Sequence, residues 1–585
     1  MRRDVNPRLQ TNRVADLSDT VRPSRRLMLI GLLCAVGVCA AFAAAGMVEG
    51  RPFDLFALLS VATGRYTPTS ATWVRFAAIT AAMVALVLLA VWLWSRRGHT
   101  PGRRGETRVD VYAPAMGYGD AVAKLSRQHA TDMAYRLVAG FDPERMEPGY
   151  PLGVNLTDGR PICTSWEDMA VVFAGPRTGK SLCYAIPAVN SAPGACLATS
   201  NKGDIIDATR PVREQRFPDA RIWVFDPERI ADPGRAEATF VWDLIAAIAT
   251  IGDAKRVADC WRYASGQPST GGDDFFPGTA ATQLADYLFA AHLGGRRVSD
   301  VFRWASNERD DEPVSIVRRH GGYDNIADRM ASVIALTPET RSGVFGSLQT
   351  MVAFLADPDL IDWVEPREHE TRPVFDARVF ATGHDTLYLL SAQGRPSTAL
   401  TAAFTAMTAF TAFNIAQAEC AANNRRLPVP LCLVLDEAAN ICRWPELADV
   451  YSYFGSAGIP IMTIWQNPDQ GKVAFGETSF GALFNNANTL VYLGGIKDAR
   501  WLGDISGLVG QREIIRGSVN VDGRGSRSVN RSIQRENILD VSDLAEWPVG
   551  RALVLASQCR AQIARTVPWT ERRQWADLVA ARKAA

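Results

Sequence analysis

Residues 174–181 read AGPRTGKS; they follow the apolar run DMAVVF and precede LCYAIPAVN, which has the composition of a helix. A phosphate-binding loop (P-loop) requires a small residue, four further residues and then Gly-Lys-Ser or Gly-Lys-Thr, between a strand and a helix. Ala174 stands where glycine is commoner, and Gly175 beside it can share the tight turn. This setting predicts an α/β domain built around a nucleotide site.

Each residue type in this loop suits phosphate binding. Backbone N–H groups around Gly179, together with the N-terminus of the next helix, would surround phosphate oxygens. Lys180 would contact the β and γ phosphates of ATP, and Ser181 would hold Mg²⁺. The predicted cofactor-binding residues are Ala174, Gly175, Pro176, Arg177, Thr178, Gly179, Lys180 and Ser181.

A second buried-strand pattern, LCLVLDEA at residues 431–438, ends in two adjacent carboxylates. In P-loop ATPases the first acid, here Asp436, orders the ligands of Mg²⁺, and the second, Glu437, would polarise the attacking water. Acidic residues also favour helix N-termini, so capping of the next helix is the alternative interpretation.

A third apolar run, residues 459–465, ends in Gln466. A glutamine at the end of a strand beside the P-loop is placed to sense the γ-phosphate or to position water, and an ordinary loop glutamine is the alternative. The predicted catalytic residues are therefore Lys180, Glu437 and Gln466, with Ser181 and Asp436 as the protein ligands of Mg²⁺.

Short apolar runs rich in Val, Ile and Leu alternate with helix-like stretches through residues 151–244 and 377–569. Such runs are typical of buried strands in a mostly parallel sheet. The expected strands are residues 169–174, 195–199, 222–225, 387–390, 431–435, 459–464, 489–493 and 552–556.

Strand signals stop between residues 245 and 376, where helices are expected at 278–292 and 326–356. We therefore predict an all-α insertion within the α/β domain. Residues 517–532 are rich in Gly, Ser, Asn and Arg and are expected to form a mobile loop.

The ends of the chain have a different character. Residues 99–150 are polar and are predicted to be a linker, with one helix at 119–141, and residues 570–585 are predicted to be a C-terminal tail.

Two runs without a charged residue, 27–48 and 76–94, indicate membrane helices. At 1.5 Å per residue they would extend roughly 33 Å and 28 Å, close to the ~30 Å hydrocarbon core. Arginines flank the outer ends of both runs, so the positive-inside rule predicts cytoplasmic termini and an outward loop. We expect residues 1–26 to be a cytoplasmic tail and residues 27–98 a multi-pass unit in the cell (cytoplasmic) membrane; a cleaved signal peptide is the alternative.

Composition excludes some classes of protein. The chain has 585 residues and a formal net charge of +1, so it lacks the global basic excess of many nucleic-acid-binding proteins. Its 10 cysteines are scattered without CxxC spacing, and its 6 histidines are too dispersed to complete a zinc site. Free thiols in a reducing cytoplasm fit this pattern best.

Taken together, these motifs resemble the coupling proteins of type IV secretion systems, which are conjugative DNA-transfer ATPases. Three segments after the P-loop helix carry the likeness: ATSNKGD at 198–204, RIWVFDPER at 221–229 and ATFVWDLI at 238–245. In the last of these, Asp243 and Leu244 replace the family's usual Asn-Pro. SAGIPIMTIWQNPDQ at 456–470 and NILDVSDLAEWPVGRALVLA at 537–556 are similar to later family segments.

The resemblance implies a RecA-like fold assembled into a homo-hexameric ring at the cytoplasmic membrane. It further implies that ATP hydrolysis delivers relaxase-bound single-stranded DNA, protein substrates or both to the components of a type IV secretion channel. None of these properties follows from composition or spacing.

Two other functions stay open at this point. A DNA translocase of the cell-division type also joins membrane helices to such a motor, but those proteins usually have four membrane helices, a long linker and a C-terminal winged helix. A nucleotide-regulated receptor with little turnover is the second alternative, against which the intact Lys180, Ser181, Asp436 and Glu437 argue. Stimulation of ATP hydrolysis by single-stranded DNA would discriminate among them.

Overall fold

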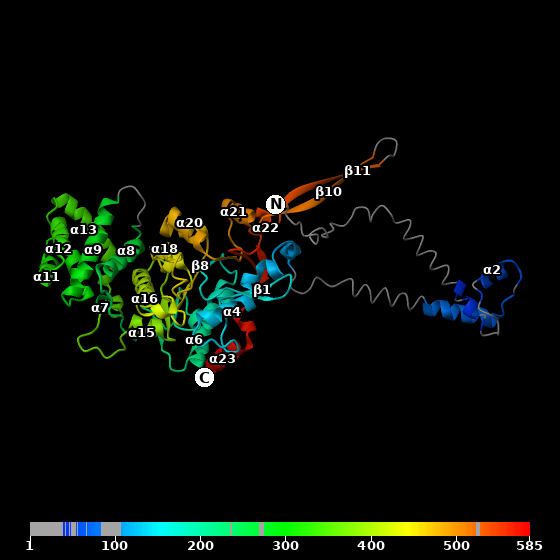
Figure 1. Ribbon diagram of the computed structural model, residues 1–585, viewed down its shortest axis with the longest axis horizontal. Helices are drawn as coiled ribbons and strands as arrows, with labels where there is room; N and C mark the ends of the chain where they lie inside the picture. The colour runs from blue at the N-terminus through cyan, green and yellow to red at the C-terminus, as the bar shows by residue number, and fades with distance from the viewer. Residues whose placement is uncertain are drawn as a thin grey trace. The chain divides into compact units, whose positions relative to one another are not determined.

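The computed structural model describes residues 39–40, 42–45, 47, 54, 56–65, 67–83, 107–234, 237–267, 274–521 and 527–584. The chain divides into two compact units, Met1–Thr107 and Arg108–Ala585. The second unit contains a large mixed sheet with helices on both faces (Figure 1).

Within the described residues this sheet has 11 strands in the order β2-β1-β13-β12-β9-β3-β8-β7-β4-β6-β5. All pairs from β9 to β5 are parallel, and all pairs from β2 to β9 are antiparallel. The strands are β1 (Pro151–Asn155), β2 (Pro161–Cys163), β3 (Ala170–Phe173), β4 (Cys196–Ser200), β5 (Ile222–Phe225), β6 (Thr386–Leu390), β7 (Cys432–Leu435), β8 (Ile461–Trp465), β9 (Thr489–Tyr492), β12 (Arg551–Ala556) and β13 (Gln562–Arg565).

The α/β class and the large parallel sheet are thus confirmed. Each of the eight apolar runs corresponds to a strand, namely β3 to β9 and β12. The short strands β1, β2 and β13, at the antiparallel end of the sheet, were not expected, because none of them has a continuous apolar run.

Alternate residues of the central strands face two separate cores. Val171 and Phe173 of β3 face one core, and Ala170 and Val172 face the other. The helices α5 (Ile186–Ser191) and α6 (Asp204–Arg216) cover the second face. The long helix α16 (Ser397–Glu419) covers the first.

Among the described residues, α16 is the one helix long and apolar enough to cross a membrane, and 78% of its apolar window is buried in the protein. That burial fits the core helix of a folded domain. The predicted membrane segments are different ones, residues 27–48 and 76–94, and most of their residues lie outside the described part of the chain. In the first unit, residues 70–83 are helical, and the ring centroids of Phe42 and Phe76 lie 5.2 Å apart.

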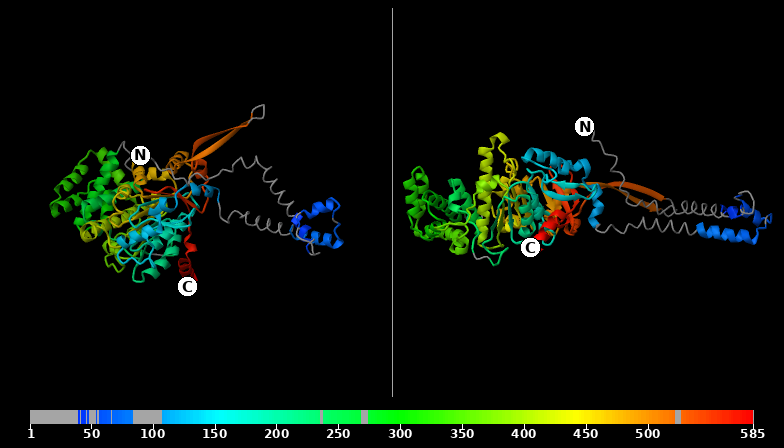
Figure 2. Two further views of the ribbon diagram at one scale, coloured as in Figure 1. Left: turned by 45° about the vertical axis from the view of Figure 1, so that its right-hand side comes forward. Right: turned by 90° about the horizontal axis from the view of Figure 1, so that it is seen from below.

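Residues 244–361 are built from helices, apart from the undescribed residues 268–273. Helix α8 packs on both α16 and α9, and the helices gather at one end of the second unit in all three views (Figures 1 and 2). They are α7 (Leu244–Ala247), α8 (Ile251–Ala264), α9 (Phe275–Leu293), α10 (Val298–Ser306), α11 (Glu312–His320), α12 (Asp324–Ile334), α13 (Pro338–Val352), η6 (Ala353–Ala356) and α14 (Pro358–Ile361).

Two expected helices are each divided into two. The stretch 326–356 breaks between α12 and α13, where Pro338 occupies the first turn of the second helix and has no N–H to continue the first. The stretch 119–141 breaks at Ser126, which caps α4 (Arg127–Leu137) by accepting a hydrogen bond from the backbone N–H of His129 at 3.2 Å. The C-terminal segment contains a helix, α23 (Arg573–Ala584), whose Arg582 pairs with Glu214 at 2.6 Å.

The prediction of a mobile loop at residues 517–532 is wrong for residues 517–521 and 527–532, which are in strands, while residues 522–526 lie outside the described part of the chain. Strands β10 (Gln511–Val521) and β11 (Arg527–Asn537) form an antiparallel ribbon in which Gln511 pairs with Asn537 and Val521 with Arg527. The Gly- and Ser-rich composition hid this pairing, because strand propensity is weak in such residues and the partner strand supplies the hydrogen bonds. The ribbon and the helical insertion lie at opposite ends of the second unit (Figure 2).

Candidate nucleotide site

The P-loop lies between the end of β3 and the one-turn helix η5 (Ser181–Ala185), and it is joined to two neighbouring strand ends. Ala174 N–H donates to the carbonyl of Trp465 at 2.9 Å, and Gly175 N–H donates to that of Gly494 at 2.9 Å. A Cβ at Gly175 would lie 2.7 Å from the Cα of Gly495, so only glycine fits this approach. Contacts with β8 and β9 therefore hold the loop in place.

The P-loop and the acidic strand end meet at one edge of the sheet. Lys180 Nζ lies 3.1 Å from Asp436 Oδ1 and also contacts Glu437 Oε1. Ser181 Oγ donates to Asp436 Oδ2 at 3.1 Å. This meeting follows from topology: β3 and β7 flank β8, and parallel strands present their carboxyl ends at the same edge.

Glu437 accepts hydrogen bonds from two side chains besides its contact with Lys180. Gln466 Nε2, just after β8, lies 2.7 Å from Oε1 and 2.9 Å from Oε2, and Asn440 Nδ2 donates to Oε2 at 2.8 Å. The Glu437 backbone has a left-handed conformation, with φ +57°, at the start of α17 (Ala438–Ile441). Such a conformation is uncommon outside glycine and costs of order 1 kcal/mol, so the surrounding contacts must hold this carboxylate in its orientation.

The charges in this cluster shift one another's proton affinities. Burial by itself lowers the pKa of Lys180, but the carboxylates of Asp436 and Glu437 outweigh it and raise that pKa above its ordinary value. Burial, together with the neighbouring carboxylate of Glu437, raises the pKa of Asp436 above its ordinary value, although Lys180 and Ser181 act to lower it. Burial also acts to raise the pKa of Glu437, but Lys180, Gln466 and Asn440 together bring it below the ordinary value. Lys180 and Glu437 are therefore both charged at neutral pH.

All five side chains predicted to act on nucleotide, metal or water, those of Lys180, Ser181, Asp436, Glu437 and Gln466, lie together. In the rest of the loop, Ala174 and Gly175 are buried, Pro176 and Arg177 are exposed, and Thr178 and Gly179 are half-buried. The chemical role of each residue stays a prediction.

Sequence analysis missed two residues of this site. Asn440 orients Glu437, and Thr199 at the end of β4 donates its hydroxyl to the backbone carbonyl of Asp436 at 2.9 Å. The spacing of Asn440 three residues after Glu437 was the one available signal, since both then lie on the same helical turn.

The donor set at this edge fits Mg²⁺. Ser181 Oγ and Asp436 Oδ2 are neighbouring hard oxygen atoms, and Mg²⁺ is typically held by one or two protein oxygens, with substrate phosphates and water as the remaining ligands. Within the described residues, no group of three or more His, Cys, Asp and Glu side chains could enclose a metal by itself. The protein would thus bind the metal together with phosphate.

Comparison with known proteins gives two kinds of similarity. Residues 430–549, which include Asp436, Glu437 and Gln466, match the family described as the TraM recognition site of TraD and TraG. No sequence among the curated proteins matches the chain.

Several solved structures share the fold at low sequence identity. The bacterial conjugative coupling protein TrwBdeltaN70, in its unbound monoclinic form, aligns with a TM-score of 0.52 and 16% identity over 76% of this chain and 91% of its own. Its trigonal form in complex with sulphate aligns with a TM-score of 0.51 and 15% identity over 76% of this chain and 92% of its own. The plasmid coupling protein TrwB in complex with ADP and Mg²⁺ aligns with a TM-score of 0.50 and 15% identity over 74% of this chain and 93% of its own.

Proposed function

We propose that this chain, which belongs to the type IV secretion coupling-protein family, is a membrane-anchored ATPase that drives conjugative substrates towards a secretion channel. The observation that carries the proposal is the convergence of the P-loop lysine and serine with two carboxylates and a glutamine at one sheet edge. A RecA-like motor needs this set of groups to bind and hydrolyse a nucleoside triphosphate.

Each side chain has a distinct task in this mechanism. The loop backbone and Lys180 would bind the phosphates, while Ser181 and Asp436 would hold Mg²⁺, which neutralises charge that develops on the phosphate oxygens. Glu437 would accept a hydrogen bond from the attacking water and so orient it. Gln466 bonds both oxygens of Glu437 and connects this carboxylate to the end of β8.

The partners and the location extend the same proposal. A solved TrwB structure contains ADP and Mg²⁺, which supports ATP and Mg²⁺ as the cofactors here. The matched family is described by a TraM recognition site, which supports a contact with a DNA-processing complex containing the relaxase and single-stranded DNA. We further propose a homo-hexamer, anchored in the cytoplasmic membrane by residues 27–48 and 76–94.

The test is ATP hydrolysis by the purified full-length chain in detergent, with and without single-stranded DNA. We expect Lys180→Ala to abolish hydrolysis, because it removes the ammonium that stabilises charge on the β and γ phosphates. Lys472→Ala is the matched control, since Lys472 is a partly exposed lysine that pairs with Asp469. Near-normal turnover in Lys180→Ala would refute the site, and nucleotide binding without turnover, with or without DNA, would indicate a receptor instead of a motor.

A further inference from the structure

The linking segment Arg443–Glu446, which follows the acidic strand end, contacts the helical insertion. It leads from α17 to α18 (Leu447–Val450). The ring of Pro445 fixes one of its backbone dihedral angles, so the segment is short and stiff. Helix α17 carries Asn440, whose amide donates to the Glu437 carboxylate at 2.8 Å. A displacement of the linking segment would therefore move a group that orients this carboxylate.

Arg443 bridges the carboxyl-terminal ends of two helices. Its Nε donates to the carbonyl of Ala439 in α17 at 3.2 Å, and its Nη1 makes a longer hydrogen bond, at 3.4 Å, to the carbonyl of Tyr263 in the last turn of α8. The last carbonyls of a helix have no partner within the helix, and a nearby cation interacts favourably with their partial negative charge. Arg443 is half-buried, so these two carbonyls replace water as partners for part of the guanidinium.

A second contact joins α8 to the other end of the linking segment. Arg256 of α8 donates to Glu446 Oε2 at 3.0 Å, and the same oxygen accepts a hydrogen bond from Nε1 of the fully buried Trp444 at 3.1 Å. The Arg256 guanidinium also lies 3.5 Å from the centre of the Phe410 ring in α16. Both ends of the linking segment are thus fixed to α8.

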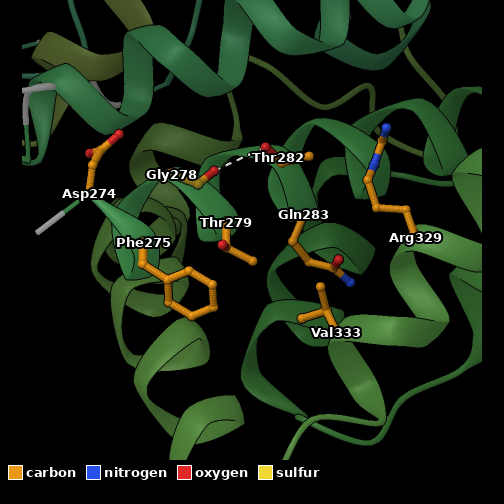
Figure 3. A pocket seen from close by; sticks show the side chains of 8 residues that line it. All are labelled: Asp274, Phe275, Gly278, Thr279, Thr282, Gln283, Arg329 and Val333. Atoms are coloured by element: carbon orange, nitrogen blue, oxygen red, sulfur yellow. Dashed lines mark hydrogen bonds between the residues drawn. The ribbon is translucent and has the colours of Figure 1, made fainter.

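The last turn of α8 is fixed from the side of the insertion as well. The buried Arg262, next to Tyr263, pairs with Asp274 and donates to the carbonyl of Gln267 at 2.9 Å. Asp274 lies at the rim of a pocket of about 370 Å³ that residues of α9 and α12 line, across from Arg329 (Figure 3). This turn of α8 therefore contacts both an open part of the insertion and the linking segment.

The left-handed backbone of Glu437 makes its orientation sensitive to these contacts, because a strained conformation persists only where its surroundings hold it. We propose that Arg443 is a positioning residue for hydrolysis: by joining α17 to α8 it keeps Asn440 within reach of Glu437, and it makes turnover depend on the placement of the helical insertion. The inference rests on the proposed function and names a means of regulation for that same site.

The test measures kcat for ATP and the Kd of a fluorescent ATP analogue separately, with the full-length chain in detergent. Arg443→Met keeps the length of the side chain but has no N–H donor. We expect its kcat to fall about tenfold, the lower end of what one hydrogen bond to a charged group contributes. The Kd should stay unchanged, because the phosphate- and metal-binding side chains are untouched. Arg443→Lys, which retains a charged donor, should keep more of the turnover.

The matched control is Arg318→Met. Arg318 is an exposed arginine of the insertion that pairs with Asp328 at 3.2 Å, so this variant makes the same chemical change away from the linking segment. We expect both its kcat and its Kd to equal those of the wild type.

A double-mutant cycle identifies the path of the effect. If Arg443 acts through Asn440, Arg443→Met should lower kcat no further in a chain that already carries Asn440→Leu. Arg256→Met removes the second contact of α8 with the linking segment. It should also lower kcat at unchanged Kd, and it should likewise have no added effect in the Asn440→Leu chain.

Four results would overturn the inference. Wild-type kcat in Arg443→Met would show that this arginine does not position the carboxylate, and a loss of nucleotide affinity as large as the loss of turnover would show that it only supports the fold. Additive effects of Arg443→Met and Asn440→Leu would exclude the path through Asn440, and wild-type kcat in Arg256→Met would exclude the insertion. A wild type without turnover, or Lys180→Ala with normal turnover, would instead refute the proposed function and remove the basis of this inference with it.

Discussion

Replacement of Glu437 by glutamine tests the assignment of the water-orienting group most directly. Each described side chain that contacts this carboxylate in the structure is a hydrogen-bond donor to it: Lys180, Asn440 and Gln466. A glutamine keeps the size of the side chain but turns one acceptor into a donor, so at least one of these contacts must break or Gln466 must rotate its amide. The new side chain also loses the basicity needed to accept a proton from water.

The expected effect on hydrolysis is large, while binding should persist. Loss of a positioned general base lowers rates by about 10²–10⁴-fold, which corresponds to about 3–5 kcal/mol in the activation barrier. Lys180 keeps its contact with Asp436 at 3.1 Å and is released from its second carboxylate, so it stays available for phosphate. We therefore expect nucleotide affinity in Glu437→Gln to equal or exceed that of the wild type.

The assay is single-turnover hydrolysis of ATP together with equilibrium binding of a fluorescent ATP analogue. Glu477→Gln is the matched control, because it makes the same chemical change away from the site. Glu477 is exposed at the start of α20 (Glu477–Asn486). If Glu437→Gln hydrolyses ATP within tenfold of the wild-type rate, another group orients the water. If it loses nucleotide binding, Glu437 supports the folded loop and the mechanistic role is wrong.

Three other changes have defined outcomes. Gly175→Ala should destabilise the fold by about 1–3 kcal/mol in chemical denaturation and weaken nucleotide binding, because the new Cβ would lie 2.7 Å from backbone atoms. The control Gly346→Ala, at an exposed helical position with open space around it, should slightly stabilise the fold. Equal effects of the two substitutions would contradict the steric role of Gly175. A chain that starts at Thr107 should stay in the supernatant and bind nucleotide, since both predicted membrane runs are gone. Recovery of this shortened chain in the membrane pellet would contradict the predicted topology. So would a reporter fused at residue 60 of the full chain that proves to lie in the cytoplasm. The pKa of Glu437 is lowered on folding, so the stability that its charge contributes is present above the ordinary glutamate pKa of about 4.3 and is lost as the pH falls through the lower folded value. The difference in unfolding free energy between the wild type and Glu437→Gln should therefore shrink across that pH range. A difference that does not depend on pH would contradict this prediction.

Much of the central sheet could be predicted because buried parallel strands have a simple sequence pattern. Strands β3 to β9 are apolar on both faces, so each is a continuous apolar run that needs no knowledge of its neighbours. Strands β1, β2 and β13 of the antiparallel extension and the β10–β11 ribbon lack this pattern. Their stability depends on partners far along the chain, as in the pairing of Val154 with Arg565, and a local window contains no record of such pairing.

The sequence by itself determined which residue types could bind phosphate and metal: Lys180 and Ser181 in a P-loop, and Asp436 and Glu437 at a strand end. Only the tertiary structure decided that strand order brings these two segments together across 255 residues, and that Asn440 and Gln466 hold Glu437 in a left-handed conformation. It alone also revealed that Gly175 must be glycine. The physical reason is that hydrogen bonds and steric contacts act over a few ångströms in space, whatever the separation along the chain.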